Sequence, residues 1–82
     1  MTFGEVEKWI ADNGTGDRIR KTVNGIDWLF VPMVDGWIAI FEYSRISGEY
    51  TPRIQASDLE KAESFIYMIE PVTIPLSPIV SE

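Results

Sequence analysis

The chain has 82 residues, contains no cysteine and no histidine, and carries a net charge of −6 at pH 7. These absences exclude a disulfide framework, a thiolate nucleophile, the usual zinc sites and a Ser-His or Cys-His relay. The acidity disfavours general binding to nucleic acid, because such binding depends on Lys and Arg side chains that neutralise phosphates.

Length and hydropathy indicate one domain that does not cross a membrane. Hydrophobic residues make up 45% of the chain, which is enough for one small core. Oligomerisation commonly adds stability to a domain of this size. The longest apolar run is interrupted by charged residues, a proline and a glycine, so it stays below the roughly 18 residues of a membrane span. No signal-peptide pattern opens the chain. We expect a cytoplasmic protein with a folded domain over residues 1–70 and a tail over residues 71–82.

The first helix is predicted to begin after Thr2, because Thr2 and Glu5 form a capping-box pattern. Asn13-Gly14 is predicted to end it as a left-handed cap. Between these signals, four apolar residues recur at helical spacing and form one stripe: Phe3, Val6, Trp9 and Ile10.

Residues 18–23 alternate as a strand and run into Asn24-Gly25, a strong signal for a two-residue hairpin turn. Arg18, Arg20 and Lys21 place three of the seven cationic residues on this strand. They are interpreted either as the solvated face of an edge strand, where charge discourages aggregation, or as a phosphate-binding patch.

Residues 26–43 form the densest apolar run and are predicted to be two strands joined by a turn at Asp35-Gly36. A two-residue loop would place Pro32 in a hydrogen-bonded pair opposite Ala39, although proline has no N–H to donate. A three-residue loop, residues 34–36, places Pro32 opposite Ile38 in a non-hydrogen-bonded pair and puts Gly36 at a position with positive φ. We therefore predict the three-residue loop.

In this register both faces of the sheet are apolar. One face carries Trp28, Phe30, Pro32, Ile38 and Ile40, and the other carries Leu29, Val31, Met33, Trp37, Ala39, Phe41 and Tyr43. Two apolar faces require cover on both sides. We expect the helices to cover one face, and a second copy of the chain, a ligand between copies, or the C-terminal tail to cover the other.

The rest of the chain is predicted to form a turn at Ser47-Gly48, a short strand or extended edge over residues 50–54, and a second helix. Pro52 should keep that strand out of the sheet centre. Residues 57–60 form a second capping box that starts a helix running to about residue 68 or 69. Prolines at 71, 75 and 78 then favour an extended tail that packs on the same domain or on a partner.

The predicted fold class is therefore α+β. We expect a single small domain in which two helices flank an antiparallel sheet of three to four strands, in the order α-β-β-β-(β)-α, followed by the extended Pro-rich tail.

No catalytic constellation is visible, so we expect a non-enzymatic protein that uses neither a cofactor nor a metal. The Ser-x-x-Lys and Gly-x-Ser-x-Gly patterns and the phosphate-binding Walker loop are all absent. Asp27, among apolar neighbours, is the one candidate for a carboxyl with a perturbed pKa, and the ordinary alternative is a cap on the Asn24-Gly25 turn.

Aromatic residues near strand ends and turns are candidates for ligand stacking or for a protein interface. They are Trp28, Trp37, Tyr43 and Tyr50. The candidates for phosphate binding are Arg18, Arg20, Lys21 and Arg53.

The chain resembles a family of small phage proteins whose characterised members are Thoeris anti-defence sponges, which sequester cyclic nucleotide signals of bacterial immunity. The likeness lies in residues 1–5, the basic strand with Asn24-Gly25, residues 50–52, residues 57–59, Ala62 and Phe65. Together these segments cover about half of the chain. The chain departs from the family in having Val23 before its Asn-Gly turn, where the family usually has tryptophan, and Ser64-Phe65 where the family has Asp-Trp.

The resemblance implies a phage-encoded, cytoplasmic homo-oligomer, a dimer or tetramer, that binds a cyclic nucleotide or ADP-ribose-like signal at subunit interfaces without hydrolysing it. Two other classes remain open. One is an acidic inhibitor of a bacterial defence complex, resembling an anti-CRISPR or a nucleic-acid mimic, whose acidic helices meet a basic surface. The other is a small virion or assembly component whose tail docks on a neighbour. None of these interpretations involves direct binding to nucleic acid or to a membrane.

Overall fold

The computed structural model describes residues 1–67 and 74–75. These residues form one antiparallel sheet in the order β1-β2-β3-β4-β5 and two helices, which confirms the predicted α+β class. The elements are α1 (Phe3–Asn13), β1 (Ile19–Val23), β2 (Ile26–Pro32), β3 (Ile38–Tyr43), β4 (Tyr50–Ala56), α2 (Leu59–Ile66) and β5 (Ile74–Pro75). The predicted tail contributes the two-residue β5, which pairs with β4 at Ile54 and Gln55. Its other residues lie outside the described part.

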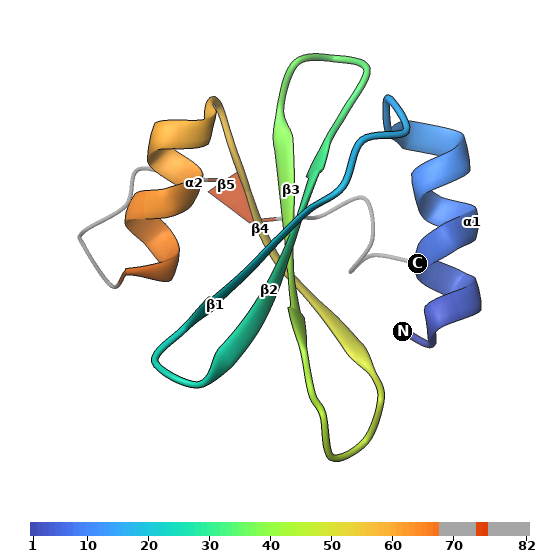
Figure 1. The fold of residues 1–82 in the computed structure, drawn as a ribbon. Helices are drawn as coiled ribbons and strands as arrows, with labels where there is room; N and C mark the ends of the chain where they lie inside the picture. The colour runs from blue at the N-terminus through green and yellow to red at the C-terminus, as the bar shows by residue number, and fades with distance from the viewer. Residues whose placement is uncertain (68–73, 76–82) are drawn as a thin grey trace.

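The sheet stands between the two helices, with α1 against one face and α2 against the other (Figure 1). The core beneath α1 contains Val6, Ile10, Leu29, Val31, Met33, Ala39, Phe41 and Tyr50. The core beneath α2 contains Trp28, Phe30, Ile38, Ile40, Ala56, Ala62 and Ile66. The two apolar faces were predicted correctly, but the expectation that both helices share one face is wrong. Each face is covered by a helix of the same chain.

The β2–β3 hairpin has the predicted three-residue loop. Pro32 lies opposite Ile38, and the amide of Gly36 donates to the carbonyl of Met33 at 3.0 Å. Gly36 has a φ of +93°, a backbone conformation that costs glycine little. Since side chains alternate along a strand, this register sends the two apolar sets to opposite faces.

The β1–β2 hairpin turns at Asn24-Gly25, as predicted, with Val23 paired to Ile26. Both turn residues have positive φ, +52° and +78°, as a type I′ turn requires. The turn leaves β1 at one edge of the sheet.

Helix α1 begins with the predicted capping box, in which the Thr2 hydroxyl accepts from the Glu5 amide and the Glu5 carboxylate accepts from the Thr2 amide. Its predicted end is wrong in one respect. Gly14 is extended, with a φ of −92°, and is not a left-handed cap. A Cβ at Gly14 would lie 3.0 Å from the Ile10 carbonyl oxygen and 3.0 Å from Cγ1 of Val31, so this position needs glycine for close packing. Phe3, predicted on the buried stripe, is 57% exposed.

Helix α2 begins one residue later than its predicted capping box. Asp58, not Ser57, is the N-cap, and its carboxylate accepts from the Lys61 amide at 2.8 Å. The helix ends at Ile66, before the predicted residue 68 or 69. Leu59, at the start of the helix, is 41% exposed, whereas Ala62 and Ile66 are buried.

Strand β4 is longer than the predicted fragment over residues 50–54. It contains a bulge, because Ile40 pairs with Ile54 while Phe41 pairs with Pro52, which leaves Arg53 without an opposite residue on β3. Pro52 lies where β4 has no described neighbour on its outer side, since β5 reaches only Ile54 and Gln55. This position is consistent with a residue that cannot donate a ladder hydrogen bond.

Candidate ligand-binding site

An open pocket of about 200 Å³ lies where β1, β2, β3 and β4 meet. Its lining residues are Arg20, Lys21, Thr22, Asp27, Trp28, Leu29, Tyr43 and Tyr50. The sheet register explains the grouping, because Arg20 pairs with Leu29, Thr22 with Asp27, Asp27 with Tyr43, and Tyr43 with Tyr50. These paired residues share the face that α1 covers. The pocket thus brings together candidates for both phosphate binding and stacking.

Asp27 is the most connected polar side chain of this pocket. Arg45 donates to both of its carboxylate oxygens, with Nη2 2.8 Å from Oδ1, and the Thr22 hydroxyl donates to Oδ1 at 2.7 Å. Hydrogen bonds from Arg45 and then Thr22, together with the charge of Arg45, lower the pKa of Asp27 from 3.8 to about 2. Asp27 is therefore a perturbed carboxyl, as predicted. It is ionised at neutral pH, and it binds Arg45 and Thr22.

The sequence interpretation did not include Arg45, although the signal was present in the hairpin register. Asp27 lies directly opposite Tyr43, and Arg45 follows two residues later. A long side chain at that diagonal position reaches across to the neighbouring strand. An acidic residue opposite an aromatic one, with arginine two residues beyond, therefore predicts this ion pair.

The four predicted phosphate ligands are not gathered in one cluster. Arg18 binds Glu7 of α1, Lys21 binds Glu63 of α2 at 2.8 Å, and Arg53 binds Glu42 of β3 at 2.8 Å. Arg18 and Lys21 thus reach opposite helices, because they project from opposite faces of the β1 segment. Hydrogen bonding to Glu63 raises the pKa of Lys21 above its usual value. Among the described residues, Arg20 has no acidic partner and is exposed at the pocket.

The four predicted stacking residues also separate. Trp28 is only 6% exposed and packs edge-to-face on Phe65, with ring centroids 5.6 Å apart, so its ring belongs to the α2 core. Trp37 is half-buried at the opposite end of β3 from Tyr43 and packs against the α1 core. Tyr43 and Tyr50 lie together, with centroids 4.8 Å apart and planes tilted by 46°. Tyr50 is buried and Tyr43 half-buried, so Tyr43 is the ring available to a ligand.

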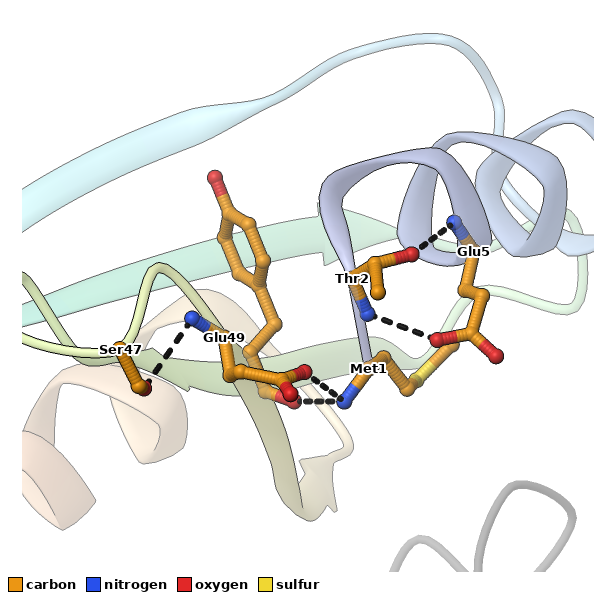
Figure 2. A network of polar contacts seen from close by, with 6 residues as sticks. Met1, Thr2, Glu5, Ser47 and Glu49 are labelled. Carbon is orange, nitrogen blue, oxygen red and sulfur yellow. Dashed lines mark hydrogen bonds and ion pairs between the residues drawn. The ribbon is translucent and has the colours of Figure 1, made fainter.

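Residues 44–49 connect the two tyrosines and form an ordered loop. The Ser44 amide donates to the Glu49 carbonyl at 3.0 Å, and the Gly48 amide donates to the Ser44 carbonyl at 2.8 Å. The Met1 ammonium donates to the Tyr50 carbonyl at 2.6 Å and lies 3.4 Å from the Glu49 carboxylate. Figure 2 shows the two contacts of the Met1 ammonium, which join the loop to the start of α1.

The described residues contain no group of acidic side chains suited to a metal ion. No helix in residues 1–67 is long and apolar enough to span a membrane. Comparisons with protein-family models, curated proteins and solved structures found no match. The case for ligand binding therefore rests on the pocket and its charges.

Proposed function

We propose that the protein binds a nucleotide signal in this pocket and sequesters it without catalysis. The observation that carries the proposal is that Arg20 and Tyr43 line the same pocket. Arg20 has no acidic partner among the described residues, and Tyr43 offers a partly open ring in the same pocket. A guanidinium group binds phosphate oxygens, and an aromatic ring stacks on a base.

The size of the pocket sets how a nucleotide fits. Small-molecule pockets commonly enclose about 300–1,000 Å³, whereas this one encloses about 200 Å³. In the proposed mode, a base enters the pocket against Tyr43, and its phosphate stays at the rim, where Arg20 lies. Asp27 does not repel the phosphate strongly, because Arg45 neutralises it.

The biological role follows the resemblance of the sequence to phage anti-defence sponges. In this role, the protein acts in the cytoplasm of the bacterial host, as a homo-oligomer, and removes a cyclic nucleotide or ADP-ribose-like immune signal. Binding without turnover is sufficient for this role, so no catalytic group is required.

Native mass spectrometry of protein purified from bacteria with an active nucleotide-signalling defence tests this proposal. We expect the wild type to release a bound nucleotide on denaturation. Arg20→Ala should lose it, whereas Lys8→Ala, which removes a cation on α1 outside the pocket, should retain it. A wild-type protein that stays empty, both in these cells and after incubation with a panel of cyclic nucleotides, would refute the proposal.

A second candidate is the acidic inhibitor of a defence complex, and the distribution of carboxylates favours it. Asp12, Asp17 and Asp35 have no cationic partner among the described residues, and they lie at the end of the domain where α1 meets the β2–β3 loop. The Val34 amide donates to the Asn13 carbonyl at 3.0 Å there, which joins the two segments.

Charge reversal distinguishes the two candidates. The triple variant Asp12→Lys, Asp17→Lys and Asp35→Lys should no longer inhibit a basic partner, whereas its nucleotide binding should be unchanged. Arg20→Ala should have the opposite effects.

A further inference from the structure

Four residues of the pocket form one row across the sheet. Thr22 of β1 pairs with Asp27 of β2, Asp27 pairs with Tyr43 of β3, and Tyr43 pairs with Tyr50 of β4. Side chains that are paired directly lie on the same face, with Cβ atoms about 5 Å apart. Asp27 is therefore the immediate neighbour of Tyr43, the ring available to a base. A base that stacks on this ring has an edge within reach of the Asp27 carboxylate.

The Asp27 carboxylate has room for one more hydrogen bond. An ionised carboxylate accepts hydrogen bonds at about four positions on its two oxygens. Arg45 donates to both oxygens, and Thr22 donates to Oδ1. No other donor among the described residues binds this side chain, which is 20% exposed. One acceptor position therefore remains on Oδ2 and lies open to a ligand.

The ion pair with Arg45 fixes what this acceptor can bind. Because the pKa of Asp27 is lowered to about 2, the carboxylate carries no proton at neutral pH and cannot donate. It therefore binds a donor and disfavours another acceptor, such as a base carbonyl. Arg45 balances its charge, so a neutral N–H group is a suitable partner.

We infer that Asp27 selects the base of the bound nucleotide by accepting a hydrogen bond from the exocyclic amino group of adenine. This inference rests on the proposed function. Adenine offers an amino donor next to a ring nitrogen that only accepts, which suits a single free acceptor position. Guanine offers two adjacent donors, which pair best with both oxygens of a carboxylate, and here Arg45 already binds both. Cytosine also offers one amino group, but its smaller ring covers less of Tyr43.

The partial exposure of Asp27 sets the size of the expected effect. A nucleotide without the amino group leaves the acceptor position without a partner. Hydrogen bonds to charged groups have the larger effects on binding, and access of water to the open pocket reduces the loss. We therefore expect the affinity to fall about 10-fold when only the amino group is removed.

Isothermal titration calorimetry of the wild type tests this expectation. The probes are cyclic AMP and ADP-ribose, each compared with the analogue in which purine replaces adenine, so that the two ligands differ only in the amino group. The purine analogue should bind about 10-fold more weakly. Asp27→Asn replaces one acceptor oxygen with a donor NH₂ group, so this variant should bind the two ligands with affinities within about twofold of each other.

Glu42→Gln is the matched control. Glu42 is also paired with an arginine, Arg53, but it lies outside the pocket, so this variant should keep the wild-type difference between the two ligands. Thermal unfolding should confirm that both variants fold. Because the inference concerns the ratio of two affinities, a change in stability alone does not produce the expected result.

The outcomes separate the inference from the proposed function. A wild type that binds the adenine and purine forms equally well would overturn the inference and leave the proposed function standing. An Asp27→Asn variant that keeps the 10-fold difference, or tighter binding of cyclic GMP than of cyclic AMP by the wild type, would also overturn the inference. A protein that binds no nucleotide would refute the proposed function, and the inference with it.

Discussion

Truncation of one buried isoleucine on each helix tests whether both faces of the sheet are covered by the same chain. Ile10 of α1 and Ile66 of α2 are each 2% exposed. Isoleucine to alanine removes three buried carbons at about 0.8 kcal/mol each, and the remaining cavity adds to this cost. We therefore expect Ile10→Ala and Ile66→Ala each to destabilise the fold by about 3 kcal/mol.

This loss is large for a domain of this size. At roughly 0.05–0.15 kcal/mol per residue, the total stability is on the order of 4–12 kcal/mol. With an m-value of roughly 1 kcal/mol/M, urea unfolding followed by tryptophan fluorescence should show a midpoint lower by about 3 M, or no folded baseline.

Exposed apolar residues on the same helices provide the controls. Phe3 of α1 is 57% exposed and Leu59 of α2 is 41% exposed. Replacing either with alanine should therefore lower the free energy of unfolding by less than about 1 kcal/mol. If Ile66→Ala unfolds at the wild-type midpoint, α2 does not pack on the sheet in solution. The face containing Trp28 and Phe30 would then need another cover, and the two-sided arrangement would be refuted.

Three further predictions concern local structure. Gly14→Ala should lower the free energy of unfolding by about 1–3 kcal/mol, because the added Cβ would clash with Ile10 and Val31. Gly4→Ala in α1 should instead raise the free energy of unfolding by roughly 0.5 kcal/mol. Urea unfolding compares the two variants, and equal stabilities would contradict the close packing at Gly14. Asp58→Ala should cost about 1 kcal/mol and Ser57→Ala almost nothing, as measured by thermal unfolding; the reverse order would restore the predicted capping box. Because folding lowers the pKa of Asp27, the ionised carboxylate stabilises the fold fully at pH values above the ordinary pKa of 3.8, and this stabilisation is lost as the pH falls toward about 2. The difference in unfolding free energy between the wild type and Asp27→Asn, measured by urea unfolding, should therefore shrink over this pH interval. A difference that stays constant would contradict the prediction.

Local turn chemistry and strand alternation predicted much of the fold. Pro32 and Gly36 together selected the loop of the β2–β3 hairpin, since one lacks an N–H and the other tolerates positive φ. That register then separated Trp28 and Phe30 from Leu29 and Phe41, and the structure places these pairs in different cores.

The placement of the helices could not be read in the same way. Alternation shows that both faces are apolar, but it does not state which segment covers each face. The stripe of α1 and the stripe of α2 have similar chemistry, so only the three-dimensional path of the chain assigns them. The same limit applies to Gly14, whose role is set by Val31 on a distant strand.

The candidate site was predicted only in part. Five of the predicted site residues line one pocket: Arg20, Lys21, Trp28, Tyr43 and Tyr50. Lys21 also binds Glu63, and Arg18 and Arg53 bind carboxylates on α1 and β3. In a chain with 13 acidic and seven basic residues, most cations find acidic partners within the fold. The closeness of Arg18, Arg20 and Lys21 in sequence therefore predicted a phosphate-binding cluster larger than the fold forms, because Arg18 and Lys21 bind carboxylates.

Titration of the ¹⁵N-labelled protein with a panel of cyclic and ADP-ribose-like nucleotides tests the central claim most directly. The account predicts saturable chemical-shift changes for one class of nucleotide, concentrated at Thr22, Asp27 and Tyr43, and their loss in Arg20→Ala. No change with any nucleotide, or changes centred on Asp12, Asp17 and the β2–β3 loop, would contradict it.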